Sequence, residues 1–347
     1  TSVRLTVDRD IQWVASKAIA KAVKSSNALS GTVIVMDPKS GHILAHATAP
    51  TFDPNDTKKV SLVAMRNPSV QDIYEPGSTG KIMTLAAAIE EKKITPETVL
   101  TVPYKLKRAD KVFSDHEPHP TQRLTASGIL AVSSNTGSIL IGEMISNQSL
   151  YDYLTKFGVG VKTGAGLPGE SRGKLLEVRD WSGTTAPTVA FGQGYSVNAM
   201  QATSIFATIA NDGVRVPPTV IAGTSDSSGN YTPTEKQKAV RVVSATTAKQ
   251  MRMMMETVVS PNGTAPTAAI QGYRVAGKTG TAQRIDDTCG CYRGYTASFI
   301  GFAPADKPAY VINVTIQDPK GMHWGGALGG PVSVSYTHLT LPTNREV

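Results

Sequence analysis

The first hydrophobic positions of the chain follow a helical period. After Asp8, apolar residues recur at steps of three and four from Ile11 to Ala22, which is the spacing of one face of an α-helix. An aspartate in this place is a favourable N-terminal cap. The pattern therefore predicts an amphipathic helix of about four turns near the start of the chain.

Strand-like runs lie toward both ends of the chain. Residues 31–37 and 42–47 are rich in β-branched and apolar residues, and the sequence PKSG between them has turn chemistry, so we predict a hairpin. Because similar runs return late in the chain, we expect one sheet to be built from both ends of the sequence. These late runs are 275–285, 295–303 and 309–317.

Helical periods dominate the middle of the chain, with breaks that contain proline or glycine. The last of these helices is rich in methionine, and such a stripe is more typical of core filling than of a binding surface. The middle of the chain is therefore expected to be mostly helical. The predicted helices cover residues 81–91, 126–145, 150–157, 201–211 and 247–258.

Composition places the chain among globular proteins. It has 347 residues, of which 40% are hydrophobic and 18% charged, and this length is roughly that of two domains. These values exclude disordered and collagen-like classes. No stretch approaches the roughly 18 apolar residues that are needed to cross a bilayer.

Basic residues outnumber acidic ones by 35 to 27, which gives a net charge of +8. Such a charge favours contact with polyanions in general. The basic residues cluster in places, as at 104–108, but they lack the interleaved aromatic residues and the motifs of nucleic-acid-binding modules. We therefore interpret the charge as a solvated surface and predict no nucleic-acid partner.

Three short polar motifs carry the candidate chemistry, and the first is STGK at residues 78–81. It follows the turn-forming sequence EPG and precedes good helix formers. Ser78 is therefore expected at a helix N-terminus, where unpaired N–H groups and the helix dipole stabilise an oxyanion. Lys81 shares its helix face and, once desolvated enough to lose its proton, can deprotonate Ser78.

The second motif, SSN at residues 133–135, supplies a hydroxyl and an amide. The hydroxyl of Ser133 can relay a proton to a leaving amine, and the amide of Asn135 can hold a substrate carbonyl. An ordinary helix cap is the competing interpretation of this motif.

The third motif, KTGT at residues 278–281, lies on a strand-like run. Lys278 with the hydroxyls of Thr279 and Thr281 suits a carboxylate. Gly280 has no side chain that could obstruct a ligand. The occurrence of all three motifs in this order carries more weight than any one of them.

This combination resembles the penicillin-binding proteins, the serine D,D-transpeptidases of bacterial cell-wall synthesis. The resemblance covers nearly the whole chain and is greatest to the transpeptidase domain of a class B, monofunctional enzyme of the division type. Secondary segments support it: LTVD at 5–8, VMDP at 35–38, EPGST at 75–79, GQG at 192–194 and FIGFAP at 299–304.

The resemblance implies an α/β (α+β) fold, in which helices flank a five-stranded antiparallel sheet and a helical subdomain is inserted. We expect the sheet-containing part at 1–66 and 182–334, the mostly helical subdomain at 67–181 and an atypical tail at 335–347. The active site is expected between the two parts.

The resemblance also implies a reaction. Ser78 would attack the carbonyl between the two terminal D-alanines of a peptidoglycan stem peptide, D-alanine would leave, and an amine from a neighbouring strand would take the acyl group. Lys81 would be the general base, Ser133 would pass a proton to the departing amine, and Asn135 would orient the stem peptide. β-Lactam antibiotics would acylate the same serine.

The KTGT motif completes the site that the resemblance implies. Lys278, Thr279 and Thr281 would hold the terminal carboxylate, with Gly280 between them. The backbone N–H groups of Ser78 and Thr281 would form the oxyanion hole. No cofactor and no metal are implied.

Members of this class carry an N-terminal membrane anchor and a pedestal domain, which we do not find in the sequence. The intact protein is expected on the outer face of the bacterial cytoplasmic membrane, with division or elongation membrane proteins as partners. The family pattern also ends in an amphipathic helix. Residues 335–343 show no helical period and Pro342 would interrupt a helix, so we expect a foreign or misread continuation there.

Three alternatives remain open. Residues 272–279 match the phosphate-loop spacing GxxxxGKT, although the sequence after them does not favour a helix. A scaffold could keep the fold without catalysis, although every expected catalytic side chain is present. A class A β-lactamase uses the same motifs with a glutamate base; Glu170 lies in the right interval, but its surroundings, LPGESRG, lack the ExxLN pattern, so we interpret it as structural.

Two further groups of residues contain potential metal ligands or a potential disulfide. The sequence HEPH at 116–119 has two histidines without further ligands, so we predict no metal site there. Cys289 and Cys291 are separated by one residue and would close a small ring. The sequence leaves open whether they are bridged or free.

Overall fold

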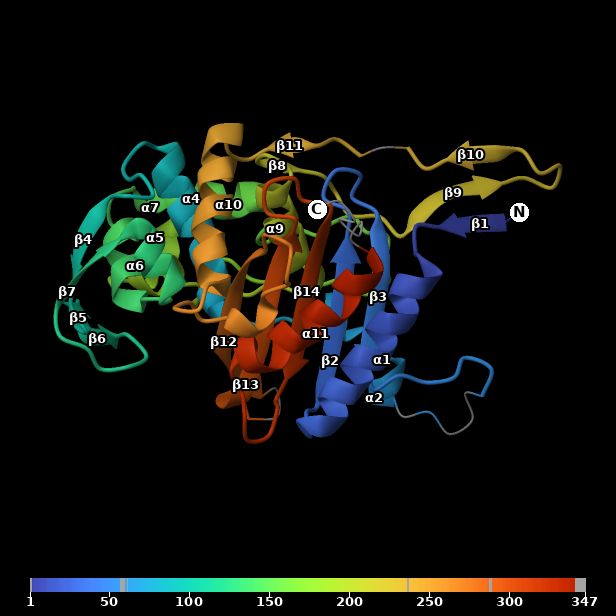
Figure 1. Ribbon diagram of the computed structural model, residues 1–347, viewed down its shortest axis with the longest axis horizontal. Coiled ribbons are helices and arrows are strands. Elements are labelled where there is room, and N and C mark those ends of the chain that lie inside the picture. The colour runs from blue at the N-terminus through green and yellow to red at the C-terminus, as the bar shows by residue number, and fades with distance from the viewer. Residues whose placement is uncertain (1, 57–59, 61, 236, 287–288, 341–347) are drawn as a thin grey trace.

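A five-stranded antiparallel sheet forms the centre of the molecule (Figure 1). The computed structural model describes residues 2–56, 60, 62–235, 237–286 and 289–340. Two strands from the start of the chain lie beside three from its end, which confirms the predicted sheet and the α/β class. In spatial order the strands are β12 (Ala276–Asp286), β13 (Cys291–Ala303), β14 (Tyr310–Gln317), β2 (Ser30–Met36) and β3 (Ile43–Ala49).

Alternate residues of the central strands point to two different cores. Val33 and Val35 of β2 belong to a core that contains α1 residues, whereas Ile34 and Met36 belong to a larger core on the opposite face. This alternation is the period of two that a strand imposes on its side chains. The sheet is consequently covered by helices on both faces.

Helix α1 (Arg9–Ser25) covers one face of the sheet, as its pattern predicted. The side chain of Asp8 accepts hydrogen bonds from the backbone N–H groups of Asp10 and Ile11 and so caps the helix. Ile11 and Ile19 are buried against the sheet. The predicted start and apolar face of this helix are therefore confirmed.

Helix α11 (Gly325–Thr340) lies beside α1 on the same face (Figure 1). The helix extends beyond Ser335, where we expected none, and only residues 341–347 of the predicted tail, with Pro342, lie outside the described residues. Close packing on β13 explains why this helix contains glycine: a Cβ on Gly329 would lie 2.7 Å from the Cβ of Phe299.

The opposite face of the sheet is covered by helices of the larger core, and most of these helices match the predicted ones. Segment 67–181 also contains four short strands that the sequence did not predict. They pair as β4 with β7 and as β5 with β6. The bounds are β4 (Val99–Val102), β5 (Lys105–Arg108), β6 (Lys111–Ser114), β7 (Gln122–Thr125), α2 (Leu62–Met65), α3 (Pro68–Gln71), α4 (Lys81–Glu90), α5 (Ala126–Ala131), α6 (Asn135–Gly142), α7 (Asn147–Phe157), α8 (Thr185–Ala190), α9 (Ala199–Ala210) and α10 (Ala245–Val259).

Two small sheets and three 3₁₀ turns complete the described structure. The sheet β1-β9-β10 projects from one end of the molecule (Figure 1), and β8 pairs with β11. Their bounds are β1 (Ser2–Leu5), β8 (Val214–Arg215), β9 (Ile221–Ser225), β10 (Tyr231–Pro233) and β11 (Val240–Arg241); the 3₁₀ turns are η1 (Gly77–Gly80), η2 (Val178–Asp180) and η3 (Pro266–Ala268).

The structure argues against a phosphate loop at residues 272–279. A phosphate-binding loop opens a helix after its Gly-Lys-Thr sequence. Here Lys278 and Thr279 lie inside strand β12 and pair with Ile300 and Phe299 of β13. These residues continue a strand, so no helix N-terminus follows the Gly-Lys-Thr sequence to hold a phosphate.

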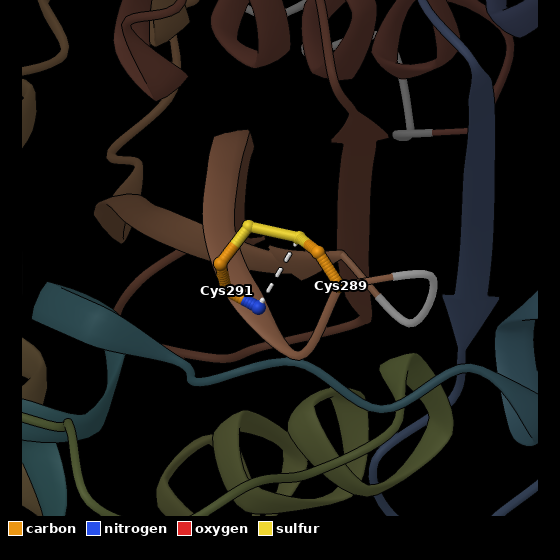
Figure 2. The surroundings of a disulfide bond; sticks show 2 residues. All are labelled: Cys289 and Cys291. Atoms are coloured by element: carbon orange, nitrogen blue, oxygen red, sulfur yellow. Dashed lines mark hydrogen bonds between the residues drawn. A yellow bond between two sulfur atoms is a disulfide. The ribbon is translucent and has the colours of Figure 1, made fainter.

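A disulfide joins Cys289 to Cys291 at the turn between β12 and β13 (Figure 2). The backbone N–H of Cys291 also donates a hydrogen bond to the Sγ atom of Cys289, at 3.3 Å. Of the two states that the sequence left open, the structure contains the bridged one.

Candidate active site

The three sequence motifs meet at one cavity of about 610 Å³. Ser78 comes from turn η1, Ser133 from the junction of α5 and α6, and Lys278 from strand β12. The cavity lies between segment 67–181 and the sheet strands, because its wall combines residues of both. It is lined, among others, by Ser78, Ser133, Asn135, Gln193, Thr264, Thr279, Thr281 and Trp324.

Ser78 lies in the 3₁₀ turn η1, immediately before helix α4. The Nζ atom of Lys81, the first residue of α4, lies 3.0 Å from the Oγ atom of Ser78. The same Nζ atom donates to the Oδ1 atom of Asn135 at 2.8 Å and to the main-chain carbonyl of Ser133. Lys81 thus has three polar contacts besides the one with Ser78, because the Oγ atom of Ser133 also lies 3.2 Å from its Nζ atom.

Lys81 and Lys278 are fully buried, with exposed fractions of 0%. Burial lowers the pKa of Lys81 to about 7, against an opposing attraction from the Asp115 carboxylate. Burial also lowers the pKa of Lys278 well below its usual range, and the nearby charge of Lys81 lowers it further. A pKa of about 7 allows Lys81 to act as a base near neutral pH.

Ser133 occupies a break between two helices where the sequence predicted one continuous helix at 126–145. Its backbone φ is +61°, a left-handed conformation that side-chain-bearing residues rarely adopt. The break places its Oγ atom 3.2 Å from the Nζ of Lys81, and Lys278 donates to the same Oγ at 2.9 Å. The Ser133 hydroxyl therefore links the two buried lysines.

The KTGT motif lies along one wall of the cavity. The Oγ1 atom of Thr279 is 2.8 Å from that of Thr264, and the Oγ1 atom of Thr281 accepts from the backbone N–H of Gly325 at 3.3 Å. Gly280 has a role beyond the predicted one of leaving space for a ligand. A Cβ on it would lie 2.4 Å from the Oγ of Ser298, so the strand needs glycine to pack there.

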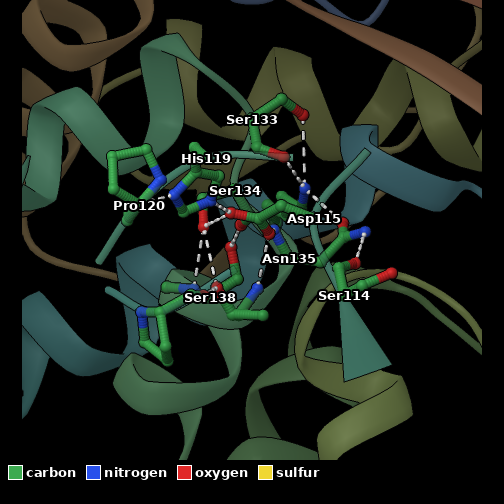
Figure 3. A network of polar contacts seen from close by, with 12 residues as sticks. Ser114, Asp115, His119, Pro120, Ser133, Ser134, Asn135 and Ser138 are labelled. Atoms are coloured by element: carbon green, nitrogen blue, oxygen red, sulfur yellow. Dashed lines mark hydrogen bonds and ion pairs between the residues drawn. The ribbon is translucent and has the colours of Figure 1, made fainter. Parts of the chain in front are cut away.

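Asp115 is a functional residue that sequence reasoning missed. It lies just after β6, and its carboxylate accepts from the backbone N–H groups of Asn135 and Thr136 and from the Ser134 hydroxyl (Figure 3). Asp115 therefore caps the N-terminus of α6 and holds the SSN motif in place. No sequence signal identifies it, because the cap comes from a loop about 20 residues before the helix it caps.

Glu170, the candidate lactamase base, is buried in its own loop. Its Oε1 atom accepts from the backbone N–H of Thr163 at 2.6 Å and from the Thr163 hydroxyl at 2.7 Å. These contacts agree with the structural interpretation of Glu170. Within the described ranges, no group of three or more His, Cys, Asp or Glu residues is placed to hold a metal ion.

Residues 31–336 match the family model for the penicillin binding protein transpeptidase domain. The chain belongs to this family. It is 40% identical over 329 residues to the penicillin-binding protein PbpB of Mycolicibacterium smegmatis, an alignment covering 92% of the chain and 51% of the relative. It is 32% identical over 336 residues to the peptidoglycan D,D-transpeptidase FtsI of Escherichia coli, covering 95% and 54%.

Solved structures agree with this assignment. The ampicillin complex of penicillin-binding protein 3 from Mycobacterium tuberculosis superposes with a TM-score of 0.92 at 36% identity, covering 99% of this chain and 80% of the other. These similarities confirm the predicted fold and the predicted class B, division-type family. The transpeptidase domain spans about half the length of the PbpB and FtsI relatives. None of the helices in its described part is long and apolar enough to cross a membrane.

Proposed function

We propose that this domain is a serine D,D-transpeptidase that cross-links peptidoglycan stem peptides through an acyl-enzyme on Ser78. One observation carries the proposal: the Nζ atom of a fully buried lysine, Lys81, lies 3.0 Å from the Oγ atom of Ser78. A serine hydroxyl is a weak nucleophile unless a neighbouring base removes its proton. Lys81, with a pKa lowered to about 7, meets that need.

The hydrogen bonds of Lys81 orient its lone pair. A neutral amine has two N–H groups, and its two shortest contacts, with the Asn135 Oδ1 atom and the Ser133 carbonyl, accept from both of them. The lone pair is then directed to the Ser78 hydroxyl and takes its proton as Oγ attacks the carbonyl carbon. This arrangement gives Asn135 a part in orienting the base, in addition to the predicted contact with the stem peptide.

Collapse of the tetrahedral intermediate requires a proton on the departing amine of D-alanine. The Ser133 hydroxyl lies within 3.2 Å of Lys81 and 2.9 Å of Lys278, so it can give its proton to the amine and regain one from Lys81. The bond between the acyl carbon and nitrogen breaks, and D-alanine leaves. The amine of a second stem peptide then attacks the ester, the bond between the acyl carbon and the Oγ atom of Ser78 breaks, and the proton lost by the amine passes through Ser133 and Lys81 to Ser78.

The cavity wall supplies the remaining groups. Thr279, Thr281 and Lys278 would bind the terminal carboxylate of the stem peptide, with Gly280 keeping the strand close to its neighbour. The backbone N–H groups of Ser78 and Thr281 would stabilise the oxyanion. β-Lactams, which carry a carboxylate and a strained amide, would enter the same site and acylate Ser78.

We further propose that the whole protein acts on the extracytoplasmic face of the bacterial cytoplasmic membrane, with division or elongation membrane proteins as partners. The similarity to FtsI and PbpB supports this location. The division of the chain into a sheet-containing part, 1–66 with 182–334, and an inserted part, 67–181, belongs to the same proposal.

Labelling with a fluorescent penicillin tests the proposal. Peptide mapping should find the adduct on Ser78, and Ser78→Ala should abolish labelling. Ser227→Ala is a matched control, because Ser227 is an exposed serine in the turn between β9 and β10 and its loss should leave labelling unchanged. Undiminished labelling of Ser78→Ala would overturn the assignment.

A further inference from the structure

His119 lies near the SSN motif. Its imidazole contacts the carboxylate of Asp115, which caps helix α6. Its side chain is 17% exposed and also borders the cavity. The Nε2 atom lies 3.0 Å from the Oδ2 atom of Asp115, and the Nδ1 atom lies 2.7 Å from the carbonyl oxygen of Pro120 (Figure 3). Both ring nitrogens of this histidine therefore have hydrogen-bond partners.

These two partners are acceptors. A carbonyl oxygen can only accept, and the Asp115 carboxylate already accepts from the Ser134 hydroxyl and from the N–H groups of Asn135 and Thr136. A neutral imidazole carries one N–H group and the imidazolium carries two. The geometry is therefore satisfied by the cation, in which both ring nitrogens donate.

We propose that His119, as an imidazolium, is a positioning residue that neutralises Asp115 and thereby sets the protonation of the catalytic base Lys81. The inference rests on the proposed function. The Asp115 carboxylate attracts a proton to Lys81 and so opposes the lowering of its pKa by burial. A cation 3.0 Å from Asp115 offsets that attraction and favours the neutral Lys81 that deprotonates Ser78.

The surroundings of His119 are compatible with a cation. The ring of Tyr104, which precedes β5, meets the imidazole edge to face with centroids 5.8 Å apart. His116 and Glu117 of the same loop line the cavity as an exposed pair 3.5 Å apart. The hydrogen bond to Pro120 raises the pKa of His119, as does Asp115, against a lowering by burial.

The pH dependence of acylation tests this role. Stopped-flow rates with a fluorescent penicillin should rise with pH as Lys81 loses its proton. In His119→Gln, which donates to Asp115 without a charge, the midpoint of this rise should move to higher pH by roughly half a unit, the order expected for one charge acting across a partly solvated site. His119→Lys, which restores a cation, should return the midpoint toward the wild-type value.

A residue that only supported the loop would lower the rate by the same factor at every pH. An unchanged midpoint in His119→Gln, or a midpoint that His119→Lys does not restore, would overturn the proposal. A wild-type protein that penicillin does not label at any pH would instead overturn the transpeptidase assignment.

A ¹⁵N NMR titration examines the protonation of His119 independently of acylation. Both ring nitrogens should carry protons at pH 6.5, and Asp115→Asn should move the His119 midpoint to lower pH. A ring that is predominantly neutral at pH 6.5 in the wild-type protein would contradict the imidazolium assignment.

Discussion

The two faces of the central sheet differ in how closely they follow ordinary packing rules. The face covered by α1 and α11 buries aliphatic side chains such as Ile19, Val33 and Ile316, and α1 has its expected aspartate cap. The cleft beside the opposite face buries two lysines and holds Ser133 at a φ of +61°. Within the described part of the chain, the buried Oε2 atom of Glu75, a residue of the EPGST segment that contains Ser78, has no hydrogen-bond partner. The same holds for the buried hydroxyl of Tyr195, which lies beside Gly80.

This difference means that one face of the sheet mainly stabilises the fold, whereas the cleft beside the other face contains the groups for the proposed chemistry. The two buried lysines and the positive φ of Ser133 are unfavourable for folding, and they lie at the cleft where a neutral lysine and a precisely aimed hydroxyl are useful. The helix-covered face compensates by burying apolar surface. Substitutions on the two faces should therefore have opposite effects on activity and stability.

Lys81→Met should give the largest effect. Removing the base should lower the rate of penicillin acylation by about 10³-fold or more. Because the cost of burying the lysine amine disappears, the free energy of unfolding should not fall, and a gain on the order of 1 kcal/mol is expected. Stopped-flow labelling measures the acylation rate, and urea unfolding measures the free energy of unfolding. A variant that is acylated slowly and is also strongly destabilised would contradict the difference between the two faces.

Ile19→Ala should behave in the opposite way. Ile19 is fully buried between α1 and the sheet, so truncation should lower the free energy of unfolding by about 2–4 kcal/mol. Acylation per folded molecule should stay within about twofold of wild type. Trp13→Ala is the control, because Trp13 of the same helix is 63% exposed and should change stability little. A large loss of acylation in folded Ile19→Ala would show that the two faces are coupled.

The pH dependence of stability should sharpen the comparison. The pKa of Lys81 is about 7 in the folded protein and 10.5 ordinarily, so between these values the unfolded chain binds more protons. The contribution of Lys81 to the free energy of unfolding should therefore rise with pH between about 7 and 10.5, by on the order of 1 kcal/mol per pH unit. The difference between wild type and Lys81→Met in unfolding experiments isolates this slope, and equal slopes in both proteins would contradict the lowered pKa.

Reduction of the Cys289–Cys291 disulfide should give the smallest effect. The bridge closes a loop of very few residues, so it removes little entropy from the unfolded chain, and it lies at the turn between β12 and β13. Acylation should stay within about twofold of the untreated protein after mild reduction. Titration of denatured, unreduced protein should find no free thiol, and two thiols would exclude the bridge.

Much of the fold could be predicted because its signals are local. Helix α1 has its cap and its apolar face within one segment, and the sheet strands are strongly apolar runs bounded by turns. Strands β5 and β6 were missed because their sequences, KLKR and KVFS, have only four residues each, and three of the four in β5 are charged. The extension of α11 beyond Ser335 was missed because residues 335–343 show no helical period and Pro342 would interrupt a helix.

The members of the site could be predicted, but their arrangement could not. Ser78, Lys81, Ser133, Asn135 and Lys278 belong to short motifs. The structure places Ser78, Ser133 and Asn135 in the wall of one cavity and the two buried lysines behind it, in contact with Ser133. The helix break at Ser133 lacks a glycine or proline signal. Asp115 and His119 act through contacts made only after folding, which no spacing in the sequence predicts.

The fate of the penicillin adduct is the most direct test of the central claim, that Ser78 forms an acyl-enzyme in a site built for transfer to an amine. With Glu170 bonded to Thr163, no general base is assigned to activate water, and hydrolysis loses the roughly 10²- to 10⁴-fold that such a base provides. Intact mass after mixing with excess penicillin G should show one penicillin per chain that persists for many minutes. Rapid return to the free mass, with steady consumption of the drug, would identify a β-lactamase and contradict the account.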